Sequence, residues 1–177
     1  FKPKAALAML AEVSRREGWQ ADDTALNHRC KRAGWLSPFY LNLLLASSME
    51  AARDRQEESG STVKMLIQAD VDDGYDRLLA SRSRFIHWYQ RLERDLAEPD
   101  FSFALAILKA LAKLDEGLTR KQLLARLQRR EPDPDKRAST ASRLVLKLEE
   151  DGYVDGTGER IQFLSFLLRD YWRRNHA

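Results

Sequence analysis

The chain is poor in several residue types that carry structure or chemistry. Cys30 is its single cysteine, which excludes a disulfide framework within the chain and is consistent with a reducing, cytoplasmic setting. The apolar-rich run of residues 41–46, like every other apolar run in the chain, falls far short of the roughly 20 residues that a membrane-spanning helix needs. The chain also begins with Phe1 rather than methionine. We therefore expect a cytoplasmic fragment of a longer protein, without a membrane partner.

The chain has few residues in arrangements suited to catalysis or metal binding. Three histidines are scattered at positions 28, 87 and 176, and they assemble no Ser/His/Asp or Cys/His set. His28 and Cys30 are too close in sequence to share a helix face, and nothing completes a zinc site around them. The phosphate-binding pattern G-x-x-x-x-G-K-[ST] does not occur, nor does an apolar run that ends in paired acids. The sequence therefore predicts no enzyme activity, no metal site and no cofactor held by this chain alone.

The chain does contain a regular pattern of apolar residues at helical spacing. Its front part predicts helices over residues 4–16 and 21–33, and a third helix that begins at the Ser-Pro pair of residues 37–38. A continuous apolar stripe runs along this third helix through Leu41, Leu44, Leu45, Met49 and Ala52. A fourth pattern covers residues 70–96, and we expect it to bend at residues 81–84, where serines and arginines alternate.

A domain boundary is expected at Glu98-Pro99-Asp100, because proline cannot continue a helix. It divides the chain into domains over residues 1–98 and 99–177. Residues 1–100 hold 15 Lys and Arg against 16 Asp and Glu, whereas residues 101–177 hold 15 against 11. The basic excess therefore lies in the second domain, which is typical of a domain that contacts nucleic acid.

The second domain combines helical patterns with one strand–turn–strand pattern. Residues 119–130 predict a short amphipathic helix, and a loop rich in proline and aspartate separates it from a helix over residues 137–150. Residues 153–154 and 161–163 are β-prone and flank the turn-forming run DGTGER, which predicts a small hairpin. The predicted inner faces of the helices are Phe103, Ile107, Leu111 and Leu114; Ala141, Leu144, Val145 and Leu148; and, after a cap at Ser165, Leu167, Leu168, Tyr171 and Trp172. The predicted fold is mainly α: an all-helical domain, then a winged helix-turn-helix domain whose small β-wing supplies the only strands.

In this order the segments resemble the C-terminal part of AAA+ and STAND-type ATPases of the origin-recognition kind, in which a helical lid precedes a winged helix. The resemblance is carried by four stretches: residues 34–44 (GWLSPFYLNLL), 67–75 (IQADVDDGY), 146–154 (LKLEEDGYV) and 166–174 (FLLRDYWRR). The first two are similar to helices of the lid. The third is similar to the junction between recognition helix and wing, and the fourth to the closing segment of many bacterial ATPases of this type.

The resemblance implies an ATP-switched protein whose ATPase domain, with its ATP and magnesium, lies upstream of these residues. Lids of this class often direct an arginine at the γ-phosphate from the start of the Pro-led helix, where this chain has none. Arg29, Lys31 or Arg32 of the preceding helix can take its place, and Trp35 and Pro38 can line an adenine pocket. The nucleotide contacts that the resemblance implies are therefore Arg32, Trp35 and Pro38.

If the winged helix binds double-stranded DNA, the N-terminal half of the helix over residues 137–150 enters the major groove. Arginines on the wing and before the proline-rich loop then add phosphate contacts. The predicted DNA-binding residues are Ser139, Thr140, Ser142, Arg143, Lys147, Arg160, Arg129 and Arg130. Acidic residues on both sides of this helix oppose DNA: Asp133, Asp135, Glu149, Glu150 and Asp151.

Two further hypotheses remain open from the sequence. The same architecture can serve as a protein-interaction or autoinhibitory module of a signalling or defence ATPase. It can also be a free-standing winged-helix transcriptional regulator with a helical sensor domain. The three hypotheses differ in partner: double-stranded DNA together with an upstream ATPase domain, a protein, or DNA alone.

Overall fold

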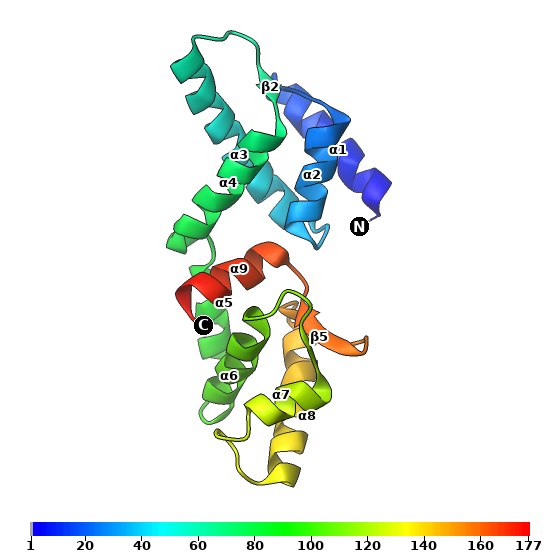
Figure 1. Cartoon of the computed structure of the whole chain (residues 1–177), viewed down its shortest axis with the longest axis vertical. Helices are drawn as coiled ribbons and strands as arrows, with labels where there is room; N and C mark the ends of the chain where they lie inside the picture. Colours follow the sequence, from blue (N-terminus) through cyan, green and yellow to red (C-terminus); the bar gives the residue numbers. More distant parts are fainter. Residues whose placement is uncertain (1) are drawn as a thin grey trace. The chain divides into compact units, whose positions relative to one another are not determined.

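The computed structural model describes residues 2–177, apart from the side chain of Arg82. The chain is mainly helical, with a few short strands (Figure 1). It forms two compact units, the first reaching to Arg82 and the second beginning at Ser83. Among residues 2–177, no helix is both long and apolar enough to cross a bilayer. The mainly helical class predicted from the sequence is therefore confirmed.

The first unit contains four helices, and its sequence explains where they begin. Proline occupies the first turn of two of them, where its missing amide leaves no bond unmade. Asp22 caps a third by accepting a hydrogen bond from the amide of Ala25 at 2.6 Å. The elements are α1 (Pro3–Arg16), β1 (Gln20–Ala21), α2 (Asp23–Ala33), α3 (Pro38–Ser59), β2 (Met65–Leu66) and α4 (Gln68–Ala80). The two strands pair in parallel, so the prediction of an all-helical front part is wrong.

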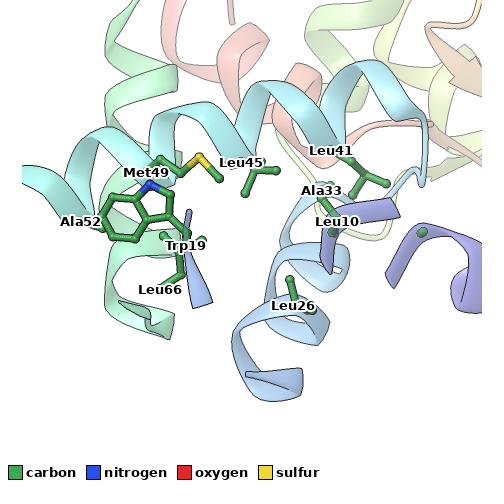
Figure 2. Packing of buried hydrophobic residues seen from close by; sticks show 10 residues of the cluster. Leu10, Trp19, Leu26, Ala33, Leu41, Leu45, Met49, Ala52 and Leu66 are labelled. Carbon is green, nitrogen blue, oxygen red and sulfur yellow. The ribbon is translucent and has the colours of Figure 1, made fainter. Parts of the chain in front are cut away.

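The core of the first unit lies along the apolar stripe of α3. All five residues of the predicted stripe are buried, and Figure 2 shows Trp19, Met49 and Leu66 packed beside one another in this cluster. Burying side chains of this size stabilises the fold by roughly 1.5–3 kcal/mol each. The stripe therefore anchors the unit.

Helices α3 and α4 approach each other closely because small residues face across their contact. Gly74 of α4 lies against the backbone of Ser47 and Ser48 of α3, and a Cβ at position 74 would stand 2.6 Å from the Ser48 amide nitrogen. Ser47 and Ser48 are both buried. A contact of this kind between two helices tolerates no added methyl group without moving one of them.

The second unit combines helices with a small antiparallel sheet. A 3-10 turn (Arg82–Arg84) begins with the last residue of the first unit. The elements of the second unit are α5 (Ile86–Asp95), α6 (Asp100–Ala112), β3 (Leu118–Thr119), α7 (Arg120–Arg126), α8 (Pro134–Glu150), β4 (Val154–Asp155), β5 (Arg160–Phe163) and α9 (Phe166–Asn175). Strand β5 lies between β3 and β4 and is antiparallel to both. Helix α6 packs against α7, α8 and α9. The predicted hairpin is β4–β5, whereas strand β3 was not expected from the sequence.

Strand β3 begins directly after a glycine that this sheet requires. Gly117 has a φ of +71°, a backbone conformation that residues other than glycine rarely adopt. A Cβ there would also lie 2.2 Å from the carbonyl oxygen of Ile161. Thr119 then ends β3 and caps α7, accepting from the amide of Gln122 at 3.2 Å while the Gln122 side chain accepts from the Thr119 amide at 2.9 Å.

Aromatic residues close the core of the second unit around Trp172. The Tyr153 hydroxyl donates to the carbonyl oxygen of Trp88 at 2.7 Å, and the Phe85 ring lies 4.9 Å from that of Tyr171. Helix α5 therefore belongs to the second unit. The sequence placed the boundary after residue 98, whereas the two units divide after Arg82, because these aromatic contacts outweigh the break at Pro99.

Other sequence predictions for the helices vary in accuracy. The bend at residues 81–84 is confirmed, since α4 ends at Ala80 and α5 begins at Ile86. The inner faces predicted for α8 and α9 are buried as expected. The helix predicted over residues 119–130 is shorter, because α7 ends at Arg126. Leu114 lies beyond the end of α6 and is exposed.

Candidate nucleic-acid interface

Helix α8 carries most of the residues that the sequence predicts to contact DNA. Asp133 caps it, accepting from the amides of Asp135 and Lys136 at 2.9 Å each, and Pro134 follows in the first turn. The bonds from these amides hold the pKa of the Asp133 carboxyl below its ordinary value. Because this carboxylate already occupies the helix N-terminus, an external phosphate would have to reach α8 through its side chains.

Arg143 extends from the exposed side of α8 but is held by an acid of another helix. Its two terminal nitrogens donate to the two carboxylate oxygens of Asp100, on α6, at 2.7 Å each. The bonds from Arg143 lower the pKa of Asp100, and the same bonds raise the pKa of Arg143. The Arg143 side chain is 57% exposed, so the pair contributes no more than about 1 kcal/mol. Asp100 therefore partly neutralises the charge of Arg143, but the bond is weak enough for another anion to replace Asp100.

Lys147 lies one turn further along α8 and is also paired. Its ammonium group is 3.0 Å from a carboxylate oxygen of Asp151, at the end of the same helix. Asp151 also accepts from Arg91 of α5 at 3.0 Å, and its side chain is 11% exposed. Lys147 thus belongs to a cluster of two cations around one acid, which ties α8 to α5.

The serine and threonine side chains of α8 are turned partly toward the protein. The Ser142 hydroxyl donates to the carbonyl oxygen of Ala138 at 2.7 Å and accepts from Arg120 of α7. The Ser139 hydroxyl donates to the carbonyl oxygen of Lys136 at 3.1 Å. Ser139 is exposed and Thr140 half-buried. Of the predicted hydroxyl contacts, Ser139 is therefore the most accessible.

The three remaining predicted arginines lie outside α8. Arg160, at the start of β5, donates to the carbonyl oxygen of Gly117 at 3.2 Å and lies 3.7 Å from Glu116. Arg129 and Arg130 lie in the turn after α7, where both side chains are exposed. Within residues 2–177, neither makes an ion pair. The structure thus leaves Arg129 and Arg130 available and holds Arg143, Lys147 and Arg160 near carboxylates.

The nucleotide contacts implied by the resemblance lie in the first unit. The guanidinium of Arg32 is 3.2 Å from Asp72 and 3.9 Å from the centre of the Tyr75 ring. The Trp35 ring lies 5.8 Å from that of Tyr40, and Pro38 is the first residue of α3. Arg32 is therefore engaged by an acid and an aromatic ring of α4, which does not fit a guanidinium reserved for a phosphate.

Arg29, one turn before Ala33 on α2, is the most unusual charged residue of the first unit. It is fully buried, and within the described chain none of its three guanidinium nitrogens has a hydrogen-bond partner. The buried acid nearby, Asp70, instead accepts two bonds from Arg55, at 2.7 and 2.9 Å. Burial lowers the pKa of Arg29 from 12.5 to about 10, because the charged form loses its hydration.

Replacing Arg29 by methionine should stabilise the first unit by about 1–3 kcal/mol, because the substitution removes a desolvated charge while keeping most of the volume. The lowered folded-state pKa means that the cost is fully present at neutral pH and is relieved only as the pH rises above about 10. Hydrogen exchange of the α2 and α4 amides measures this stability unit by unit. Arg53→Met, on the exposed face of α3, is the matched control and should change stability little. A loss of stability in Arg29→Met would contradict this interpretation.

Metal binding has no support from the side chains of residues 2–177, among which no group of three or more His, Cys, Asp or Glu could hold an ion. Comparisons of the chain with protein-family models, curated proteins and solved structures give no match. The interpretation of the interface therefore rests on its own geometry and charge.

Proposed function

We propose that the second unit is a winged helix that binds double-stranded DNA. The observation that carries the proposal is the order α6, β3, α7, α8, β4, β5, with β5 between the other two strands. In such a unit α7 and α8 form the helix-turn-helix, and the β4–β5 hairpin is the wing. The lid role of the first unit and the upstream ATPase domain that switches it are part of the same proposal.

DNA contact through this unit is mainly electrostatic. The exposed N-terminal half of α8 approaches the bases with Ser139 and Arg143, while Arg129 and Arg130 of the α7–α8 turn contact phosphates. Glu149, Glu150 and Asp151 keep the other end of α8 away from the backbone. Because two of the cations on α8 are already paired with Asp100 and Asp151, binding is weak and poor in sequence specificity.

A protein partner is the second candidate, and one exposed side chain favours it. Leu146 projects from α8 with 57% of its surface exposed, between Arg143 and Lys147 in sequence. Protein interfaces bury apolar side chains inside a polar rim, and Leu146 is an apolar side chain that a docking protein could cover. A chain that binds no duplex would make this protein-interaction or autoinhibitory role the leading one.

Asp100→Asn should strengthen DNA binding by about 5–10-fold at about 0.1 M salt, because it removes a negative charge and frees Arg143 for one more phosphate. In the parent chain, Arg143→Ala should weaken binding by less than about twofold, since a phosphate would have to displace the Asp100 carboxylate that already partly neutralises Arg143. In the Asp100→Asn background, the same substitution should abolish the gain. This double-mutant cycle, measured by fluorescence anisotropy with a labelled duplex, isolates the pair.

The matched control for this cycle is Asp115→Asn. Asp115 is an exposed acid that, like Asp100, is paired with an arginine, since it lies 2.6 Å from Arg173, and its loss changes the net charge by the same amount. If Asp100→Asn gains no more affinity than Asp115→Asn, Arg143 does not approach DNA and α8 is not the contact surface.

A further inference from the structure

All charged residues that line a groove between α6 and the end of α7 are positively charged. It encloses about 840 Å³. Its charged lining residues are Lys109, Lys113, Arg126 and Arg129, and Gln128 lies among them. The four cations come from two parts of the chain: Lys109 and Lys113 from the end of α6, and Arg126 and Arg129 from the end of α7 and the turn after it. Of these residues, only Arg129 was predicted from the sequence to contact a partner.

The spacing of these cations is unfavourable unless an anion neutralises them. Lys109 lies in the last turn of α6 and Lys113 directly follows this helix, whereas Arg126 ends α7 and Arg129 lies in the turn after it. The four like charges that line this one groove repel one another, and a bound anion relieves that repulsion. Among residues 2–177 none of the four makes an ion pair, and no acid lines the groove. By contrast, Arg143 holds a carboxylate.

The chemistry of the lining selects phosphate groups rather than exposed bases. Four cations, with the amide of Gln128 beside them, supply many hydrogen-bond donors for anionic oxygens. The lining holds no aromatic side chain, whereas proteins that bind unpaired bases stack them on aromatic rings. The apolar part of the lining includes Ala106, Ala110 and Ala125, whose short side chains leave space for an anionic ligand.

We propose that this groove binds a run of phosphates and that their source is the phosphodiester backbone of duplex DNA, as a second contact separate from α8. The identification of duplex DNA as the source of the phosphates rests on the proposed function. The inference that the groove binds phosphate groups rests on its lining alone. The groove accounts for most of the roughly four phosphates that binding neutralises, so most of the affinity and salt dependence arises at α6 and α7 rather than at α8.

The test compares two double variants of the whole chain. Lys109→Gln/Arg126→Gln removes one cation from each side of the groove, and should weaken binding of a short duplex by about tenfold or more at about 0.1 M salt and reduce the salt slope by about two. Lys4→Gln/Arg53→Gln makes the same change at exposed positions of the first unit, and should alter affinity by less than about twofold. Circular dichroism checks that both variants keep the parent helicity.

A second measurement identifies the ligand by amide NMR shifts, with tripolyphosphate and the duplex as separate probes. Both should shift the amides of Ala110, Ala125 and Gln128 in the parent chain and leave them unmoved in the groove variant. If the duplex binds parent and groove variant equally, the groove inference is overturned while the proposed function stands. If only tripolyphosphate binds, and at these amides, the phosphate site stands and the duplex function fails. If neither probe shifts them, the groove inference fails.

Discussion

Gly74→Ala is expected to lower the free energy of unfolding of the first unit by about 2–3 kcal/mol. In an exposed helix, replacing glycine by alanine would raise the free energy of unfolding by about 0.5–1 kcal/mol, because alanine is the better helix former. Here the new methyl group would stand 2.6 Å from the Ser48 amide nitrogen and 2.8 Å from the Ser47 carbonyl carbon. These are backbone atoms of α3, so α3 and α4 must separate, and overpacking of this kind costs more than the propensity gain.

Hydrogen exchange measures this loss separately in each unit, because the two units need not unfold together. The amides of α3 and α4 should lose protection in Gly74→Ala, while those of α6 and α8 should keep it. Asp76→Ala on the exposed side of α4 is the control, and should change stability by less than about 0.5 kcal/mol. Unchanged protection of α3 in Gly74→Ala would show that the helix contact is looser than described.

The features of the fold that depend on local sequence patterns, such as buried helix faces and a tight turn, were predicted correctly from the sequence. The stripe of α3 and the inner faces of α8 and α9 follow helical spacing, and all are buried. The turn DGTGER marked the β4–β5 hairpin correctly. Strand β3 was missed because two residues show no alternation. Its pairing depends on Gly117, whose role appears only when β5 lies beside it.

Long-range contacts explain most of the remaining differences. Helix α5 was assigned to the first domain because Pro99 is the strongest local break, but Tyr153 binds the carbonyl of Trp88 across 65 residues. Arg29 lies on a helix of weak amphipathic character, so sequence spacing did not predict its burial. The closeness of α3 and α4 at Gly74 was equally invisible.

The candidate site was predicted in outline but not in its electrostatics. The bond between Lys147 and Asp151 follows from their spacing of four on one helix, whereas the partner of Arg143 is Asp100, 43 residues away. The spacing of Lys109 and Lys113 is visible in the sequence. Their closeness to Arg126 and Arg129 depends on how α6 packs against α7, which no local pattern reveals.

The salt dependence of duplex binding by the whole chain tests most directly whether the second unit is a DNA-binding winged helix. Releasing counterions from about four phosphates lowers log K by roughly 3.6 per decade of salt, so affinity should fall about a hundredfold between 50 and 200 mM. Fluorescence anisotropy with a labelled duplex, titrated at several salt concentrations, gives this slope. We expect binding at 50 mM salt that is steeply lost toward 200 mM and nearly independent of DNA sequence. No binding at 50 mM, or an affinity unchanged by salt, would contradict a DNA-binding role for this unit.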